Sequence, residues 1–186
     1  MRTISRFPET IDAAPCQEVV ILEPNIYDLP IPIHFHGDGG PYITAGVVIA
    51  RHPVHGQNLD FHRCMPFSAK EMAVRVVEGR HFHTFLEDLG QLEVAICVGN
   101  TPNILAAGAT SVAIGMDELT IANSLEPLTV VKAKTVDLMV PAESEFVLEG
   151  MVYRDRRNPE GPFVDLTGTQ DVVRIEPVFE IHAITH

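Results

Sequence analysis

Short runs of apolar and β-branched residues, separated by Gly and Pro, recur along most of the chain. Runs of this length and composition, bounded by turn-forming residues, predict β-strands. The segments that we expect to form strands are residues 17–23 (QEVVILE), 42–51 (YITAGVVIAR), 71–79 (EMAVRVVEG), 92–99 (LEVAICVG), 128–140 (LTVVKAKTVDLMV), 145–155 (EFVLEGMVYRD) and 172–185 (VVRIEPVFEIHAIT).

Three segments have helical spacing of apolar residues instead: 81–90 (HFHTFLEDLG), 101–109 (TPNILAAGA) and 115–126 (GMDELTIANSLE). The first ends on Gly90, a typical C-cap residue, and the other two open with capping residues. There is no internal repeat. The pattern predicts a single α+β domain over residues 1–186, with antiparallel strands in a barrel or sandwich rather than a doubly wound sheet.

One late stretch does not fit a strand. Residues 158–165 (NPEGPFVD) contain two prolines and a glycine, which predict a loop. The stretch also carries two carboxylates, Glu160 and Asp165, and follows a run of arginines. It is either a solvated turn or a rigid loop that presents two acids to a basic group elsewhere in the fold.

Composition narrows the classes of function. The chain has 13 basic and 25 acidic side chains, a formal charge of −12, so nucleic acid and anionic membranes would repel it. Its 3 cysteines are far apart in the sequence, which predicts buried thiols in a reducing, cytoplasmic setting. The first fifteen residues lack the apolar region of a secretory signal, and no apolar run is long enough to span a bilayer.

The 9 histidines are numerous for a chain of this size. HFH occurs twice, at residues 34–36 and 81–83. His81, His83 and Glu87 have the spacing of a cupin metal site, but the second cupin element is missing. A cupin-like metalloprotein is therefore an alternative that spacing alone leaves open. We assign no role to the first HFH.

Residues 56–63 (GQNLDFHR) combine Asn58, which offers a hard oxygen to a metal, with Arg63, whose planar fork suits a carboxylate or phosphate. On a regular strand the two side chains point to opposite faces. Residues 38–44 (DGGPYIT) are either a close backbone approach to a ligand or a hairpin turn. From spacing alone the chain is an α+β domain with a possible metal or anion site.

Five blocks taken together resemble a known family, the UbiD-like decarboxylases, which use prenylated FMN. The blocks are DGGPYIT-AGVVIA, QNLDFHR, EGRHFHTF, DLMVPAESEFVLEG and NPEGPFVDLTG, and the resemblance extends from Leu29 to Ile184. It implies a split β-barrel related to flavin reductases, with a few short helices. It also implies a reversible, non-oxidative decarboxylase acting on an aromatic or α,β-unsaturated acid.

The resemblance further implies where the cofactors bind. A divalent ion, Mn²⁺ or Mg²⁺, would link the phosphate of prenylated FMN (or FMN) to Asn58, His81 and Glu118. Hard oxygens and one imidazole suit either ion. A K⁺ ion would lie near the segment AAGATS. The residues that match flavin-lining positions are Thr44, Asp60, Phe61, His62, Arg63, Arg80, His81, Thr110 and Ser111.

By the same resemblance, three residues form the catalytic group: Arg63, Glu160 and Asp165. Glu160 would deliver the proton that replaces CO₂. Arg63 would hold Glu160, and Asp165 would hold Arg63. This gives the stretch 158–165 a function.

The chain departs from the family in length, since family members are more than twice as long. From the resemblance, we expect the chain to be the central domain without the family's N-terminal region and without the C-terminal domain, which provides oligomer contacts, a lysine for the cofactor phosphate and most of the substrate pocket. Two explanations stay open: a compact member that works with a partner subunit or as a homo-oligomer, and a non-catalytic flavin-binding module. A working enzyme would also need a flavin prenyltransferase to supply the cofactor.

Overall fold

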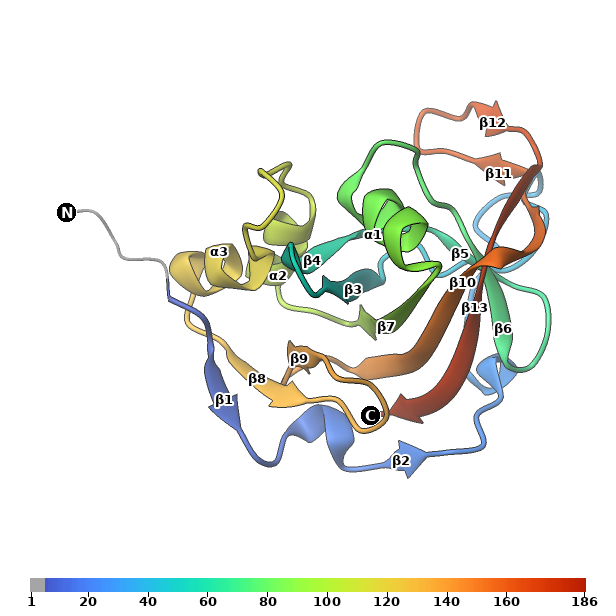
Figure 1. Ribbon diagram of the computed structural model, residues 1–186. Coiled ribbons are helices and arrows are strands. Elements are labelled where there is room, and N and C mark those ends of the chain that lie inside the picture. The colour runs from blue at the N-terminus through green and yellow to red at the C-terminus, as the bar shows by residue number, and fades with distance from the viewer. Residues whose placement is uncertain (1–5) are drawn as a thin grey trace.

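The computed structural model describes residues 6–186, so the first five residues of the stretch tested for a secretory signal lie outside it. Most of the described strands form one antiparallel sheet in the order β4-β3-β7-β10-β13-β6-β5, with β2 paired to β13 (Figure 1). Its strands are β2 (Val20–Ile21), β3 (Val47–His52), β4 (Gly56–Phe61), β5 (Cys64–Pro66), β6 (Glu71–Val74), β7 (Gln91–Val98), β10 (Phe146–Glu160) and β13 (Arg174–Thr185).

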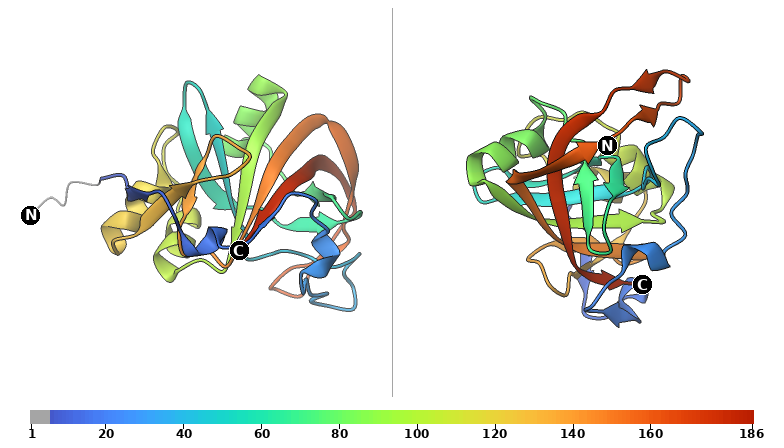
Figure 2. Two further views of the ribbon diagram at one scale, coloured as in Figure 1. Left: turned by 90° about the horizontal axis from the view of Figure 1, so that it is seen from below. Right: turned by 90° about the vertical axis from the view of Figure 1, so that its right-hand side faces the viewer.

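Strands β10 and β13 are the long central pair of this sheet, and they run side by side in Figure 1 and in the left view of Figure 2. Their register shifts at Glu149/Gly150 and again at Tyr153/Arg157, as expected where a β-bulge bends a strand. Beyond the second shift the two strands stay paired until Glu160 lies opposite Arg174. This paired extension carries Glu160 away from the central part of the sheet.

Alternation along the strands covers both faces of the sheet with apolar side chains. On β3, Val47 and Ile49 belong to one buried cluster, and Val48 and Ala50 belong to another. Helices α2 (Pro102–Gly108) and α3 (Glu118–Leu125) contribute to the first cluster, and α1 (His81–Leu89) contributes to the second. Helices on both faces therefore meet the edge strand β4, which contacts all three of them.

Smaller elements complete the described part of the chain. Strand β8 lies between β1, with which it is parallel, and β9. Strands β11 and β12 form a separate hairpin that projects beyond the sheet (Figure 1). The bounds are β1 (Glu9–Ile11), β8 (Thr129–Lys132), β9 (Met139–Pro141), β11 (Phe163–Val164), β12 (Gln170–Asp171) and the 3₁₀ helices η1 (Pro15–Gln17) and η2 (Ile26–Asp28).

The α+β class and the three expected helices are confirmed. Gly90 has φ 75° and its N–H bonds to Leu86, which is the left-handed C-cap expected at the end of α1. Three other expectations were wrong. Residues 128–140 form two antiparallel strands, β8 and β9, because the chain turns back between them. Residues 17–23 form only the two-residue strand β2, because the pairing with β13 extends over two residues. Residues 158–165 are not all loop, because pairing with β13 continues β10 as far as Glu160.

The three cysteines are free and buried, as expected. Burial raises the pKa of the Cys16 thiol to about 11, so this thiol is uncharged at neutral pH. Between residues 6 and 186, no helix combines the length and the apolar character needed to cross a bilayer.

Candidate functional site

A cavity of about 350 Å³ opens between β4, the start of α1, the end of α2 and the start of α3. Segments far apart in the sequence meet there because β4 is an edge strand with helices on both sides. The lining residues are Asn58, Leu59, Asp60, Phe61, His62, Val77, Arg80, His81, Gly108, Ala109, Thr110, Ser111, Val112 and Glu118.

Strand alternation orders the polar residues along β4. Leu59 packs into the apolar cluster shared with α2 and α3. Its neighbours Asn58 and Asp60 therefore face the opposite side, where α1 lies. His81, the first residue of α1, places its Nδ1 3.0 Å from Asn58 Oδ1. A buried amide oxygen and an imidazole nitrogen thus point at each other inside the cavity.

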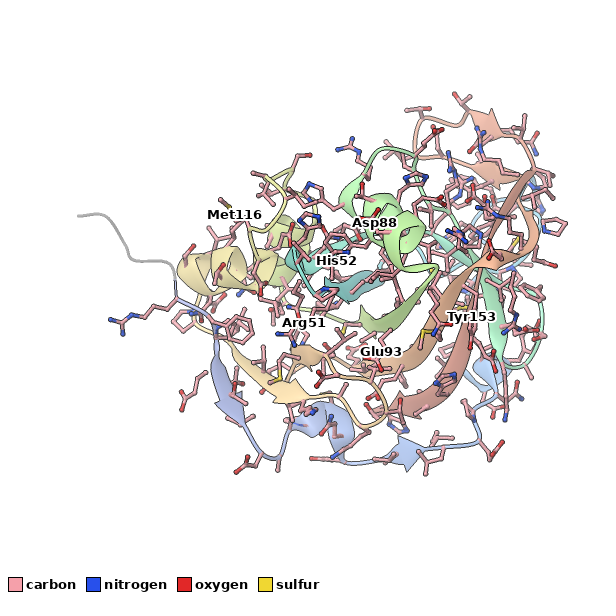
Figure 3. The ribbon with its side chains drawn as sticks, in the orientation of Figure 1. Arg51, His52, Asp88, Glu93, Met116 and Tyr153 are labelled. Atoms are coloured by element: carbon pink, nitrogen blue, oxygen red, sulfur yellow. The ribbon has the colours of Figure 1, made fainter. Side chains whose placement is uncertain are left out.

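Helix α1 is held firmly enough to fix His81. Phe82 and Phe85 are buried beneath the helix. Near its other end, Asp88 Oδ2 lies 3.8 Å from His52 Nε2 on β3 (Figure 3). The His52 ring also lies against the Phe85 ring, with 5.1 Å between the centroids. Because the helix is attached along its length, its first residue has a defined position at the cavity.

Glu118 enters the cavity from the opposite side. It is the first residue of α3, whose N-cap Asp117 accepts the N–H of Leu119. The Glu118 carboxylate accepts the backbone N–H of Leu59 at 3.0 Å, on the open side of the edge strand. Burial raises the pKa of Glu118 to about 7, and the nearby Asp60 adds to the rise. A cation in the cavity would lower this pKa again.

The donor set at the cavity fits a hard divalent ion. Adjacent ligands of an octahedral ion with bonds of about 2.1 Å are separated by about 3 Å, which is the Asn58–His81 separation. The buried Nδ2 atom of Asn58 has no hydrogen-bond partner within residues 6–186. In the same part of the chain, no three His, Cys, Asp or Glu side chains are grouped to hold a metal. An ion here would therefore need further ligands from a bound molecule.

The cupin alternative fails on geometry. His81 and His83 lie two positions apart on a helix, so their side chains point in different directions. His83 and Glu87 line a different cavity, next to Glu176 and Pro177. The three residues of the H-x-H-x-x-x-E pattern lie on one helix but face two different cavities, so they do not share a metal site.

His62 can bring positive charge to the cavity when it is protonated. Its Nδ1 lies 2.8 Å from the carbonyl oxygen of Arg75, and its Nε2 lies 2.9 Å from Asp60 Oδ1. The contact with Asp60 is close but lacks hydrogen-bond geometry, so neither of these two atoms has a hydrogen-bond partner within residues 6–186. Burial alone would lower the pKa of His62, but the charge of Asp60, its contact with the ring and the bond to the Arg75 carbonyl raise it above its ordinary value. Together with Arg80, a protonated His62 favours an anionic ligand.

A second polar cluster follows directly in the sequence. Arg63 donates two hydrogen bonds to Glu160, from Nε to Oε1 at 2.8 Å and from Nη2 to Oε2 at 2.9 Å. The Tyr42 hydroxyl donates a third, to Oε1, at 2.8 Å. The Arg63 guanidinium lies 4.5 Å from the centre of the Phe163 ring. Glu160 is fully buried, so these donors replace the water that an exposed carboxylate would have.

Asp171, and not Asp165, supports Arg63. Asp171 accepts from Arg63 Nη2 and from Arg174 Nη2, each at 2.8 Å. These bonds, led by the one from Arg174, hold the pKa of Asp171 well below its usual range. Asp165 instead accepts the backbone N–H groups of Thr167 and Thr169. The prediction that Asp165 contacts Arg63 is therefore wrong, because the Asp165 carboxylate accepts hydrogen bonds within its own turn.

The structure brings most of the residues singled out in the sequence to one place. Asn58, His81 and Glu118 line the cavity, as do seven of the nine residues matched to flavin-lining positions. Thr44 and Arg63 are the exceptions. Thr44 lines a smaller, mostly apolar cavity beside His34, and Arg63 turns to Glu160. Sequence reasoning did not identify Tyr42 or Asp171. Tyr42 lies within the DGGPYIT block, but no local signal marks Asp171.

The chain that carries these two clusters matches a known protein family. Residues 9–186 match the UbiD family, described as a 3-octaprenyl-4-hydroxybenzoate carboxy-lyase Rift-related domain. The chain is 45% identical over 164 residues to an anhydromevalonate phosphate decarboxylase of Methanothermobacter thermautotrophicus, and 38% identical over 170 residues to one of Methanocaldococcus jannaschii. These alignments cover 84% and 89% of this chain but 38% and 40% of the relatives. The chain therefore spans less than half the length of either.

Solved structures give the same result. An evolved dimeric form of the UbiD-class enzyme HmfF from Pelotomaculum thermopropionicum, in complex with prFMN, superposes with a TM-score of 0.93 at 36% identity. The closed form of vanillic acid decarboxylase from Sedimentibacter hydroxybenzoicus superposes with a TM-score of 0.92 at 29% identity. Each alignment covers 96% of this chain, with 44% and 41% of the solved chains.

Proposed function

Because the chain belongs to the UbiD family, we propose that it carries the cofactor site and the proton donor of a prenylated-FMN-dependent decarboxylase. The reaction is the reversible, non-oxidative loss of CO₂ from a carboxylic acid, with a proton taking the place of CO₂. The observation that supports this proposal beyond family membership is the environment of Glu160. Glu160 is fully buried and accepts two hydrogen bonds from Arg63. Arg63 directly follows the cavity-lining residues 58–62 in the sequence.

The cavity between β4 and the three helices is the proposed cofactor site. The modified flavin supplies an electron sink for the pair left when CO₂ departs. Asn58, His81 and Glu118 would hold Mn²⁺ or Mg²⁺ against its phosphate, and the 3.0 Å between Asn58 Oδ1 and His81 Nδ1 supports this assignment. The unpartnered Nδ2 of Asn58 could donate a hydrogen bond to a phosphate oxygen. Arg80, and His62 when it is protonated, would add positive charge for the phosphate. The K⁺ ion that the family resemblance implies would lie near the segment 106–111 (AAGATS).

Glu160 is the proposed general acid. Arg63 orients its carboxyl group through two parallel hydrogen bonds, and Asp171 holds the guanidinium from the other side. Burial of the pair excludes bulk water, so the proton reaches the substrate carbon from a positioned group. The contribution of this chain is thus orientation and proton delivery.

The relatives favour one class of substrate. Four curated relatives, at 38–45% identity, are anhydromevalonate phosphate decarboxylases. Two solved structures that are named as decarboxylases of aromatic acids, vanillic acid and 3,4-dihydroxybenzoic acid, are 29% and 25% identical. We therefore propose an α,β-unsaturated, phosphorylated acid as the substrate, in preference to an aromatic acid.

We propose that the chain is a single domain that folds as a split β-barrel of the flavin-reductase type. The bridge between Ile43 and Cys64 supports this fold, because it joins the segment before β3 to the far edge strand β5. This bridge brings the two ends of the sheet order toward each other, as barrel closure requires.

We propose that the working enzyme is a homo-oligomer or includes a partner subunit. In support, the hairpin region exposes a group of apolar side chains, and exposed groups of this kind mark interfaces. Its members are Leu166, Val172, Val173 and Ile175.

A flavin prenyltransferase would supply the cofactor. Three buried free thiols suit a reducing cytoplasm.

A non-catalytic flavin-binding module is the second candidate. One experiment separates the two. The chain is produced together with a flavin prenyltransferase, and its absorption spectrum, its manganese content and its release of CO₂ from anhydromevalonate phosphate are measured. Flavin and metal with CO₂ release support the enzyme. Flavin and metal without CO₂ release, even with candidate partner subunits added, support the module. Absence of both cofactors would refute the cofactor site.

A further inference from the structure

The segment of residues 37–42, which includes the DGGPY motif, is docked on the turn that follows Glu160. The N–H of Gly39 donates to the carbonyl of Pro162 at 2.7 Å. The Asp38 carboxylate accepts the N–H of Val164 at 2.9 Å. Two motifs separated by more than a hundred residues are therefore joined by one backbone–backbone and one backbone–side-chain hydrogen bond.

This contact requires glycine at position 39. A Cβ atom added there would lie 2.3 Å from the carbonyl oxygen of Gly161, well inside van der Waals contact. Gly40, the next residue, has room for a Cβ, with its nearest neighbour, a Met65 side-chain atom, at 3.8 Å. The first glycine of the pair thus permits a close backbone approach, and this explains part of the DGGPY motif.

The same segment ends at Tyr42, whose hydroxyl lies 2.8 Å from Glu160 Oε1. The hydroxyl is 3.5 Å from the carbonyl of Pro162, so its proton is directed to the carboxylate. Burial raises the pKa of Tyr42 well above its usual range, and the hydrogen bond to Glu160 raises it further. Tyr42 is therefore a neutral donor throughout the neutral range. Its neighbour Ile43 is bridged to Cys64, so Tyr42 and Arg63 approach Glu160 together.

The donors are divided unequally between the two oxygens of Glu160. Oε1 accepts from Tyr42 and from Arg63 Nε, and Oε2 accepts only from Arg63 Nη2 within the described chain. A carboxylate oxygen has two lone-pair sites. Both sites of Oε1 are filled, whereas Oε2 keeps one. A proton added to Glu160 therefore goes to Oε2.

We propose that Tyr42 is a positioning residue that selects Oε2 of Glu160 as the oxygen that carries the transferred proton. This inference rests on the proposed function. In the forward step, the bond between the substrate carbon and CO₂ breaks, and the electron pair left behind takes the proton from Oε2. Glu160 becomes a carboxylate, stabilised by Tyr42 and Arg63, and regains a proton from solvent before the next turnover. Without the hydroxyl, the proton occupies either oxygen and transfer slows.

The contact is tested first without any cofactor. The chain has 3 tyrosines, so labelling with 3-fluorotyrosine gives three ¹⁹F resonances. Tyr27→Phe and Tyr153→Phe assign two of them and leave the third to Tyr42. We expect Glu160→Gln to shift the Tyr42 resonance and to leave that of the exposed Tyr27 in place. An unchanged Tyr42 resonance would overturn the proposal. This measurement does not require the Tyr42 variant to be stable.

The role in proton transfer is tested in the complete enzyme. Tyr42→Phe keeps the ring packed against Phe163, 4.8 Å away, and removes only the hydroxyl. We expect kcat to fall about tenfold, as for the loss of one hydrogen bond to a charged group, with little change in KM. Tyr27→Phe is the matched control. In the Glu160→Gln background, Tyr42→Phe should cause no further loss, because the residue acts through Glu160.

The two experiments separate the possible failures. If the Tyr42 resonance shifts but the wild-type enzyme releases no CO₂, the proposed function fails although the contact exists. If the wild-type enzyme is active and Tyr42→Phe retains full kcat, or if the loss persists in the Glu160→Gln background, the positioning role is wrong.

Discussion

Arg63 and Glu160, 97 residues apart in the sequence, form a two-pronged ion pair in which the carboxylate is fully buried and the arginine side chain keeps 16% of its surface exposed. The pair is positioned by two different parts of the sheet, the connection between β4 and β5 and the end of β10. A buried carboxylate is costly unless such donors meet it, and removing one partner is more harmful than never having had the pair. A buried ion pair at this position suits a catalytic group better than a stabilising one.

Glu160→Gln should therefore remove activity without removing the cofactor. The amide keeps the shape of the side chain but cannot deliver a proton. We expect turnover of the complete enzyme to fall at least about a hundredfold, with flavin and metal content unchanged. Steady-state CO₂ release and the absorption spectrum measure both. Near-normal turnover would mean that Glu160 has a structural role alone.

The two nearby aspartates should behave differently. Asp171→Asn weakens the hold on Arg63 and should lower turnover by about tenfold or less. Asp165→Asn should leave turnover close to that of the wild type, because the Asp165 carboxylate bonds within its own turn. Kinetics of the two variants side by side check the assignment. A larger loss for Asp165→Asn would show that the turn rearranges in the working enzyme.

The metal site should be separable from Glu160. His81→Ala or Asn58→Ala removes a proposed ligand, and we expect either to weaken Mn²⁺ retention at least about tenfold and to reduce flavin retention with it. His83→Ala is the matched control, because His83 lies on the same helix but lines another cavity. Metal analysis and flavin absorbance of purified variants give the answer. Wild-type contents in both ligand variants would refute the site.

Glu118 should make stability depend on pH when no metal is bound. Its pKa is raised to about 7 in the folded chain, whereas an unfolded glutamate titrates near about 4.3. Its stabilising contribution is therefore complete below about pH 4 and is lost as pH rises through 7. Between pH 5 and 8, we expect the wild type to lose up to about 3 kcal/mol in unfolding free energy relative to Glu118→Gln.

Urea unfolding at the two pH values tests this, and Glu126→Gln at the exposed end of α3 controls for the removal of one charge. Added Mn²⁺ should restore the wild type at pH 8 and leave Glu118→Gln less affected. A wild-type pH dependence equal to that of Glu118→Gln would contradict the buried carboxyl assignment.

The two glycines of the DGGPY motif should differ in their tolerance of alanine. Gly39→Ala places a Cβ against the carbonyl of Gly161, and we expect a loss of about 1–3 kcal/mol in unfolding free energy. Gly40→Ala meets only ordinary contacts and should change stability by less than about 1 kcal/mol. Urea denaturation of both variants makes the comparison. Equal effects would show that the approach of the two backbones is not tight in solution.

The sequence by itself determined the elements whose cause is local. Short apolar and β-branched runs marked the strands β3, β7, β10 and β13, and helical spacing with a glycine cap marked α1. The five family blocks also pointed to the polar residues that gather at the cavity beside β4. These predictions succeed because periodicity and caps act over a few residues, so neighbours in the sequence are enough to decide them.

Tertiary structure alone decided which groups meet. Pairing with β13 turned the expected loop at Asn158–Glu160 into the end of a strand. Competition for hydrogen bonds assigned Asp171 to Arg63 and left Asp165 to its own turn. Tyr42 reached Glu160 because the backbones of two distant motifs pack against each other. Such contacts depend on sheet register and on close packing between segments far apart in the chain, and no local pattern records either of them.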